Sequence, residues 1–373
     1  MCVLPYMRAM SGIATKSERK PAVYLDHAAT TPVCAAARAA MAEALMLIGN
    51  PSSVHSGGRA ANAVLEGARD ALATWAGADP ESLIFTSGGT EALALALNGS
   101  GATRILASAT EHSAVLAARD DIEILPVDAN GLLDLEALAA ALAKGPALVA
   151  IQHANNETGV VQPLAAIADL IAAHGSKLLV DAVQSAGKLP LPQADFIALS
   201  AHKLGGPPGV GALIARDPAS LTAIQRGGGQ ERGRRGGTPN LPGIAGFAAA
   251  LAERPDWAAV EARRNALEAR LNTQVHGASA PRLPSITSLA LPGVSAQTQV
   301  MALDLAGFMV SAGAACSSGK VKTSHVLTAM GLGVAAGEAI RVSVSPATSD
   351  AELGAFADAW LAMARRLAPK AAA

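Results

Sequence analysis

The feature that most constrains the fold is a series of five short apolar segments, each followed within a few residues by polar or ionisable residues. Segments of this length are typical of buried strands, and helical stretches separate them. Strands that alternate with helices indicate an α/β fold, a doubly wound and mostly parallel sheet. The carboxyl ends of parallel strands meet at one edge of a sheet, so we expect one ligand crevice there. The apolar segments are residues 83–85, 104–106, 147–151, 177–180 and 196–199.

The last two of these segments end in an acid and in a lysine. Asp181 follows the first of the two, and Lys203 comes shortly after the second. Gln184 and His202 are close to them in the sequence, so all four side chains should converge on the crevice. An acid and an amine together suggest a pyridoxal phosphate site, in which the lysine carries the cofactor as a Schiff base and the carboxylate keeps the pyridine nitrogen protonated. From these two residues alone, an ordinary ion pair is the slightly favoured interpretation. The motifs in the rest of the chain favour the cofactor site instead.

A turn of small residues, 86–90, separates the first apolar segment from a helix that continues from Glu91. Its glycines, Gly89 among them, allow an anion to approach the backbone amides at the start of the helix. The hydroxyl groups of Ser87 and Thr90 can add hydrogen-bond donors. A cofactor phosphate fits this turn, although a Gly-Gly pair before a helix is also a common turn that binds no ligand.

Other polar residues have two interpretations. His112 either stacks on a cofactor ring and shuttles protons or is a polar residue near a helix start. The paired Asn155 and Asn156 are common turn residues. Arg341 lies in an expected strand at residues 340–344, where it is either a surface charge or a bidentate clamp for a carboxylate.

Two segments of small residues are expected to be irregular. Residues 227–240 contain six glycines and three arginines, and form either a flexible basic linker or an ordered anion loop with Thr238 as a phosphate donor. In the second segment, residues 311–319, Cys316 lies close to Lys320, which favours the thiolate. This setting suits a mobile nucleophile better than a buried thiol that packs as a small hydrophobe.

Composition limits the classes of function. A net charge of -1 gives no reason to expect nucleic acid as a partner. No apolar run reaches the length of a membrane span, so no membrane is expected either. The three cysteines, Cys2, Cys34 and Cys316, show neither a metal-binding spacing nor a disulfide framework, so no metal site is expected and a reducing cytoplasm is the simplest setting.

The chain is long enough for two domains. Residues 1–35 are expected to be a leader and an N-terminal segment that joins the smaller domain. Residues 36–248 form the large cofactor-binding domain. Beyond them the pattern changes to that of a smaller α+β domain, residues 249–373, which carries the segment with Cys316. Its first helix is expected at residues 253–271.

Taken together, these motifs resemble those of the cysteine desulfurases, pyridoxal phosphate enzymes of the class V aminotransferase group. The resemblance runs from Tyr24 to Arg341 and implies the PLP-dependent transferase fold of type I, with L-cysteine as the substrate. The matching motifs are residues 24–32, 50–55, 85–91, 111–112, 155–159, 181–188, 200–203, 227–240 and 311–319.

The resemblance implies that one group of residues holds the cofactor. Lys203 would form the Schiff base, and Asp181 would hold the pyridine nitrogen. Gln184 and Asn156 would contact the ring oxygen of the cofactor or the substrate. The phosphate would be bound by residues of the turn and of the strand end and by one residue from a neighbouring subunit, which makes a homodimer part of the active site. These phosphate contacts are Gly89, Thr90, Ser200, His202 and, from the neighbour, Thr238.

The remaining residues would carry out the chemistry. Lys203 would move the α-proton, assisted by His112, which stacks on the ring. Arg341 would clamp the carboxylate of the substrate. Cys316 would attack the sulfur of the bound cysteine, which gives an enzyme persulfide and releases alanine. The sulfur would then pass to an acceptor, such as an iron–sulfur scaffold protein.

Two alternatives stay open. A selenocysteine lyase or a cysteine sulfinate desulfinase would share the fold and the cofactor. The segment with Cys316 favours a desulfurase, because substrates with a better leaving group need the cysteine less. The more distant alternative is an inactive scaffold or binding subunit, and the presence of Lys203, Asp181 and Cys316 argues against it.

Overall fold

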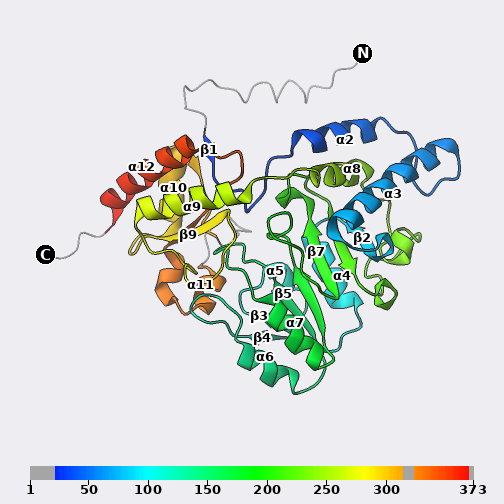
Figure 1. The fold of residues 1–373 in the computed structure, drawn as a ribbon, viewed down its shortest axis with the longest axis horizontal. Coiled ribbons are helices and arrows are strands. Elements are labelled where there is room, and N and C mark those ends of the chain that lie inside the picture. The colour runs from blue at the N-terminus through cyan, green and yellow to red at the C-terminus, as the bar shows by residue number, and fades with distance from the viewer. Residues whose placement is uncertain (1–21, 314–322, 369–373) are drawn as a thin grey trace, which may run out of the picture.

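The structure is a computed structural model that describes residues 22–313 and 323–368. Its centre is a seven-stranded sheet in the order β2–β8–β7–β6–β5–β3–β4 (Figure 1). Every strand of this sheet is parallel to the others except β8, which is antiparallel to both of its neighbours. The strands are β2 (Leu83–Thr86), β3 (Ile105–Ser108), β4 (Ile122–Leu125), β5 (Leu148–Gln152), β6 (Lys177–Asp181), β7 (Phe196–Ser200) and β8 (Gly211–Ala215).

Helices cover both faces of this sheet. Alternate residues of a strand point to opposite faces: Val149 and Ile151 of β5 pack with one group of helices, whereas Leu148 and Ala150 pack with the other. The first group is α3 (Ser56–Ala76), α6 (Leu135–Leu142), α7 (Leu164–Ala173) and α8 (Leu241–Ala250). The second group is α4 (Gly89–Gly99) and α5 (Ser113–Leu116). Both faces are therefore buried, which confirms the predicted doubly wound α/β architecture.

A second, smaller lobe has its own core. In it β1 (Val23–Tyr24) pairs in parallel with β10 (Phe308–Met309), and β9 (Ile286–Ala290) pairs antiparallel with β11 (Ala339–Ser343). Its core joins Leu289 and Ile340 to side chains of the helices that cover the strands, such as Phe356 and Trp360. The helices of this lobe are α9 (Trp257–Leu271), α10 (Ala296–Leu305), α11 (His325–Ala329) and α12 (Asp350–Leu367).

The domain boundaries at residues 35 and 248 stay predictions. What supports the first is that Leu25 packs in the core of the smaller lobe, whereas α2 (Ala35–Leu45) packs against α8 of the larger lobe. The second falls inside α8, and Leu251 just after this helix still belongs to the larger core. The lobes lie side by side in Figure 1, with α9 and α12 at the left and the large sheet at the right.

Some elements differ from the sequence-based expectations. Helix α9 starts at Trp257 instead of residue 253, because Pro255 disfavours helical backbone before it and Asp256 caps the helix by accepting a hydrogen bond from the amide of Ala259. The pattern also missed β4, an edge strand in which only Leu125 is buried. The glycine-rich residues 227–240 contain a short 3-10 turn, Glu231–Gly233.

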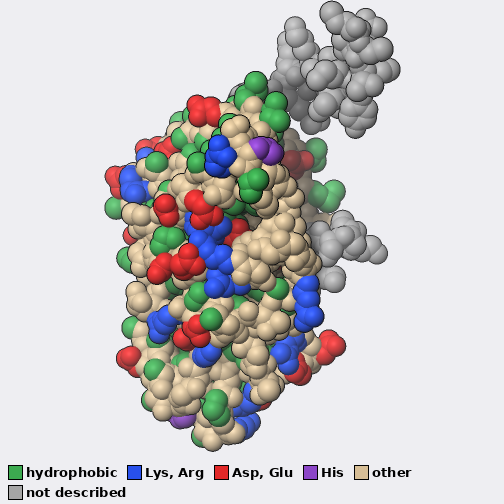
Figure 2. Space-filling view, turned by 90° about the vertical axis from the view of Figure 1, so that its right-hand side faces the viewer, with side chains coloured by type: hydrophobic (Ala, Val, Ile, Leu, Met, Phe, Trp, Pro, Cys, Tyr) green, Lys and Arg blue, Asp and Glu red, His purple; other side chains and the backbone are tan. Residues whose placement is uncertain are grey.

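The surface facing the viewer in Figure 2 carries basic and acidic side chains next to one another. Ion pairs of this kind join Arg232 to Glu66 and to Glu81. Across residues 22–313 and 323–368, the structure contains no helix that is both long and apolar enough to cross a bilayer.

Candidate active site

The turn before α4 provides a site for an anion at one edge of the sheet. Gly88, at the N-cap, has no side chain to occupy the amides of the first helical turn. The packing around this turn is close: a Cβ atom on Gly89 would lie 2.6 Å from Cγ2 of Val183, and one on Gly211 would lie 2.6 Å from Cα of Gly88. Free amides at a helix N-terminus attract anions, so the turn suits a phosphate.

A cavity of about 490 Å³ adjoins this turn and the carboxyl ends of β5, β6 and β7. It brings together residues that are far apart in the sequence. Ten of the predicted site residues line it: Gly89, Thr90, His112, Asn156, Asp181, Gln184, Ser200, His202, Lys203 and Arg341.

The amine of Lys203 is the reactive group of this cavity. Its Nζ donates hydrogen bonds of 2.6 Å to the carbonyl oxygens of Ala28 and Ala29. Burial lowers the pKa of Lys203 to about 8, and the nearby positive charge of Arg341 adds to this effect, against the attraction of Asp26 and Asp181. The amine is therefore far more nucleophilic at neutral pH than that of an exposed lysine.

The carboxylate of Asp181 lies at the end of β6, buried in the same cavity. Its Oδ1 accepts a hydrogen bond of 2.9 Å from the amide of Val183. Burial raises the pKa of Asp181, while that hydrogen bond, the nearby imidazole of His112 and the positive charge of Lys203 act to lower it. A cation placed near this carboxylate would be favoured, because it would offset the burial.

Glu111 is a second carboxyl group close to Asp181. It is fully buried, and burial raises its pKa well above the ordinary value, an effect that the charge of Asp181 strengthens. Its Oε1 accepts a hydrogen bond of 2.9 Å from the amide of Gln152. Its Oε2 has no hydrogen-bond partner among the described residues. Burial therefore disfavours the charged form of Glu111.

His112 is oriented by the helix that follows it. Its Nδ1 accepts a hydrogen bond of 3.1 Å from the amide of Ala114, which caps α5. Burial lowers the pKa of His112, so the ring is neutral and its proton is on Nε2. The imidazole can therefore donate one hydrogen bond to a ligand in the cavity.

Two more predicted residues are fixed by the segment that follows β1. Gln184 donates from Nε2 to the carbonyl oxygen of Ala28 over 2.9 Å. His202 Nδ1 is 3.2 Å from the hydroxyl of Thr30. The loop at residues 28–30 thus holds the side chains of Gln184, His202 and Lys203 together.

The guanidinium of Arg341 is held in place by a carboxylate that sequence reasoning missed. It donates to Oδ1 of Asp26 over 2.6 Å and to the carbonyl oxygen of Asn156 over 2.9 Å. The side chain is 5% exposed, and its Nε has no hydrogen-bond partner among the described residues. The only sequence signal for Asp26 was its place in the motif at residues 24–32.

Two predicted residues are not found in this cavity. Thr238 lies elsewhere on the same subunit, in a smaller cavity of about 170 Å³ that Ser87 and Arg235 also line. Its segment is anchored, because Arg235 forms an ion pair of 2.8 Å with Glu91 of α4 and Glu231 forms one of 2.9 Å with the buried Arg69. Cys316 lies outside the described residues.

The cavity fits pyridoxal phosphate. It combines a lysine of lowered pKa, a buried carboxylate and an anion-binding turn. These are the groups that would take the aldehyde, the pyridine nitrogen and the phosphate of that cofactor. Among the residues that the structure describes, no group of three or more His, Cys, Asp or Glu side chains is arranged to hold a metal ion.

Comparisons with known proteins identify the family to which this chain is similar. A family model described as Aminotransferase class-V matches residues 23–356. The chain is 43% identical over 358 residues to "Cysteine desulfurase" of Cereibacter sphaeroides, an alignment that covers 89% of this chain and 92% of the relative. It is 38% identical over 336 residues to "Putative cysteine desulfurase IscS 1" of Bacillus subtilis (strain 168), with 83% and 89% covered. Its fold matches that of a solved NifS-like protein from Rickettsia africae ESF-5 with a TM-score of 0.84 and 33% identity, covering 92% of this chain and 99% of that one.

Proposed function

The chain belongs to the aminotransferase class-V family, and from this premise we propose that it is a pyridoxal phosphate-dependent cysteine desulfurase. The observation that carries the proposal is that Lys203, Asp181 and the turn before α4 adjoin one cavity, together with an arginine suited to a carboxylate. The names of the relatives agree with this chemistry.

The residues around the cavity would hold the cofactor in one orientation. The amides of the first turn of α4, with Thr90, Ser200 and His202, would bind its phosphate, and Lys203 would bond to its aldehyde carbon. The buried carboxylate of Asp181 would keep the pyridine nitrogen protonated. Bound in this way, the cofactor would supply an electron sink for cleavage of the carbon–sulfur bond.

On the substrate side, Arg341 would bind the carboxylate of L-cysteine. Asp26 and the carbonyl of Asn156 already orient its guanidinium, so little side-chain entropy is lost on binding. Lys203 and His112 would move protons between the α-carbon and the solvent. The amide of Asn156 would contact the substrate or the cofactor.

Cys316 would receive the sulfur. Its thiolate would attack the sulfur atom of the bound cysteine, so that a sulfur–sulfur bond forms as the carbon–sulfur bond breaks. Protonation of the carbon gives L-alanine, and the enzyme keeps a persulfide on Cys316. One L-cysteine and one thiol thus give one L-alanine and one persulfide, without a separate oxidant or reductant.

We propose that the enzyme works as a homodimer in which Thr238 reaches the phosphate of the neighbouring subunit. Supporting this is an exposed apolar surface formed by Leu45, Met46, Ile48 and Val54, with exposed fractions of 68%, 81%, 91% and 89%. Apolar surfaces of this kind are typical of protein contacts. The segment that carries Thr238 lies close to it, because Pro51 and Ser52 line the same small cavity as Gln230 and Pro239.

We propose that the sulfur is supplied for iron–sulfur clusters or other sulfur-containing cofactors, through an acceptor protein. Two of the names among the relatives, IscS and NifS-like, belong to desulfurases or related proteins. We also propose a cytoplasmic location, since a reducing compartment is the simplest setting for three cysteines that show no disulfide framework.

The proposal is tested by incubating the purified protein with pyridoxal phosphate, L-cysteine and a reducing thiol, and by measuring alanine and sulfide in the same sample. We expect equal amounts of both products from the wild type and neither from Lys203→Ala. Cys316→Ala should keep the cofactor but release no sulfide. Release of alanine from selenocysteine or cysteine sulfinate, with none from L-cysteine, would instead assign the enzyme to one of those substrates.

A further inference from the structure

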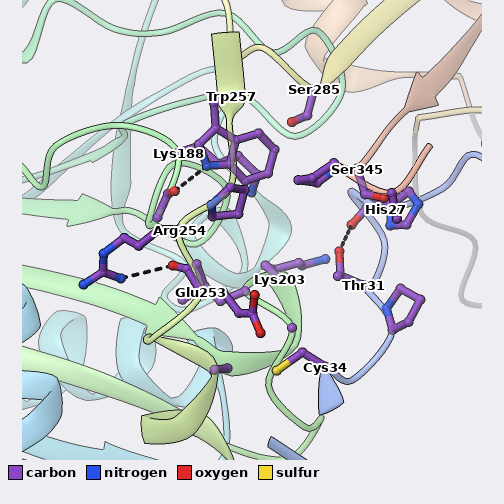
Figure 3. A pocket seen from close by; sticks show the side chains of 18 of the residues that line it. His27, Thr31, Cys34, Lys188, Lys203, Glu253, Arg254, Trp257, Ser285 and Ser345 are labelled. Carbon is purple, nitrogen blue, oxygen red and sulfur yellow. Dashed lines mark hydrogen bonds between the residues drawn. The ribbon is translucent and has the colours of Figure 1, made fainter. Parts of the chain in front are cut away.

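A second cavity lies behind Lys203, and the site described above does not account for it. Its volume is about 390 Å³, and Ala28, Gln184 and Lys203 line both cavities. In Figure 3, Lys188 and Trp257 lie together on one side of it, and Lys203 points into it from another. The surroundings of Lys188 therefore bear directly on the groups that would hold the cofactor.

Lys188 joins the turn after β6 to helix α9. Its Nζ donates a hydrogen bond of 2.7 Å to the carbonyl oxygen of Gln184, and it lies 5.6 Å from the centroid of the Trp257 ring. The indole Nε1 of Trp257 donates a hydrogen bond of 2.6 Å to the carbonyl oxygen of Gly187. Trp257, the first residue of α9, thus holds the turn through both its ring face and its N–H group.

The turn after β6 also packs closely against the segment that contains Lys203. Gly187 has a φ of +71°, and a Cβ atom there would lie 2.7 Å from Cδ2 of Leu204, the residue after Lys203. On the other side, Gln184 and Lys203 both donate to the carbonyl oxygen of Ala28. A continuous set of contacts therefore runs from α9 through Lys188 and Gln184 to Lys203.

We propose that Lys188 is a positioning residue, which holds Gln184 and Lys203 in place for the cofactor by joining the turn after β6 to α9 of the smaller lobe. The inference rests on the function proposed above. Through Lys188, capture of the cofactor would depend on the contact between the two lobes. Neither the phosphate contacts nor the substrate contacts provide this dependence.

The role of Lys188 depends on its hydrogen bond and its packing, not on its charge. Burial and the positive charge of Lys203 lower the pKa of Lys188 to about 7, so the two amines repel each other in their protonated forms. The other charged or titratable groups that face the cavity are His27, Cys34, Glu253 and Arg254. Lys188 is therefore mostly neutral at the pH near 8 at which Lys203 titrates, and its removal should leave the pH at which the amine of Lys203 becomes nucleophilic unchanged.

The test uses the apo-protein, to which pyridoxal phosphate is added at a series of pH values while its visible absorption is followed. We expect Lys188→Met to bind the cofactor about tenfold more weakly, because the carbonyl of Gln184 loses its hydrogen-bond donor. The pH midpoint of capture should stay near that of the wild type. Lys188→Arg, which places a permanent charge at this position, should move the midpoint below that of the wild type, and Trp257→Phe should weaken binding to a smaller extent.

The matched control is Lys177→Met, which removes an exposed lysine at the start of β6 and should behave as the wild type. Thermal unfolding of each apo-protein separates a change in fold from a change in the site. If Lys188→Met has the affinity of the wild type, or only a lower melting temperature, the inference is overturned. If the wild type itself captures no cofactor, the proposed function fails first, and the two failures are thus distinguishable.

Discussion

At the scale of single residues, two neighbouring buried carboxyl groups have different surroundings. Asp181 faces a cavity that it shares with the cationic Lys203 and with His112. Among the described residues, Glu111 has one side-chain hydrogen-bond partner, the amide of Gln152, and the charge of Asp181 opposes its ionisation. The surroundings of Asp181 therefore favour an anion more than those of Glu111 do.

Removal of the charge of Asp181 should be far more damaging than the same change at Glu111. We expect Asp181→Asn to lower the rate of cysteine turnover by about 10²–10³-fold, because a developing charge loses its electrostatic partner. Glu111→Gln keeps an oxygen that can accept from Gln152, and Glu111 does not line the cavity, so its rate should stay within about threefold of the wild type. Steady-state rates for the two variants decide this, and equal losses would contradict the difference between the two carboxyl groups.

The pH dependence of cofactor capture should reflect the environment of Lys203. Its pKa is lowered to about 8, so the amine is a protonated, unreactive ammonium below that pH and a neutral nucleophile above it. Capture of pyridoxal phosphate by the apo-protein should therefore speed up as the pH rises and level off above about 8. Stopped-flow absorbance measures this rate. A midpoint near 10.5, the ordinary lysine value, would contradict the buried setting.

At the scale of elements, the position of the anion-binding turn depends on strand β8. Gly211 of this strand faces Gly88, and the strand runs antiparallel between β2 and β7. A side chain at position 211 would push the turn away from the strand ends. Glycine is therefore required here by close approach of two backbones.

Gly211→Ala should impair both folding and cofactor binding. The new Cβ would lie 2.5 Å from the carbonyl oxygen of Leu199 and 2.6 Å from Cα of Gly88, so we expect a loss of about 1–3 kcal/mol in the free energy of unfolding. Affinity for pyridoxal phosphate should also fall by about tenfold or more, since the displaced turn holds its phosphate. Urea unfolding and equilibrium binding measure the two effects.

Gly67→Ala is the control for this substitution. Gly67 lies in the exposed part of α3, and a Cβ atom there would meet no heavy atom within 4 Å. This variant should gain about 0.5–1 kcal/mol in the free energy of unfolding, because alanine favours the helix. A Gly211→Ala protein as stable and as tightly binding as this control would contradict the role of the close approach.

Much of the larger lobe could be predicted because apolar runs mark buried strands and polar residues mark their ends. The structure places Asp181 and Lys203 at one cavity, as that pattern predicts. Asp26 could not be identified in this way. Its contact with Arg341 spans 315 positions in the sequence and depends on the bridge between residue 26 and Ser343 of β11. The role of Lys188 likewise depends on packing against α9, which periodicity does not report.

At the scale of the whole molecule, Thr238 is the residue that the single chain leaves unexplained. It is on the same chain as the cavity but lines a different one. The ion pairs Arg235–Glu91 and Arg69–Glu231 fix its segment to the larger lobe. In the proposed homodimer, this fixed segment would carry Thr238 to the site of the neighbouring subunit.

Mixed dimers test this arrangement. In a dimer of one Lys203→Ala subunit and one Thr238→Asp subunit, both changes fall in the same site if Thr238 acts across the interface. The other site is then intact, so mixing and exchange of the inactive Lys203→Ala protein and the weakly active Thr238→Asp protein should restore cysteine turnover. Thr238→Asp should be weakly active alone, because its carboxylate would repel the phosphate. No gain in activity on verified subunit exchange would show that Thr238 does not act across the interface.

The cavity beside Asp181 is the proposed catalytic centre, and Lys203 is the residue proposed to bond to the cofactor. The most direct measurement is to reduce the protein with borohydride in the presence of pyridoxal phosphate and to locate the modified residue by mass spectrometry. We predict a single modified lysine, Lys203, and loss of the modification when L-cysteine is added before the reductant. Modification of Lys188 instead, or of no lysine at all, would show that Lys203 is not the residue that bonds to the cofactor.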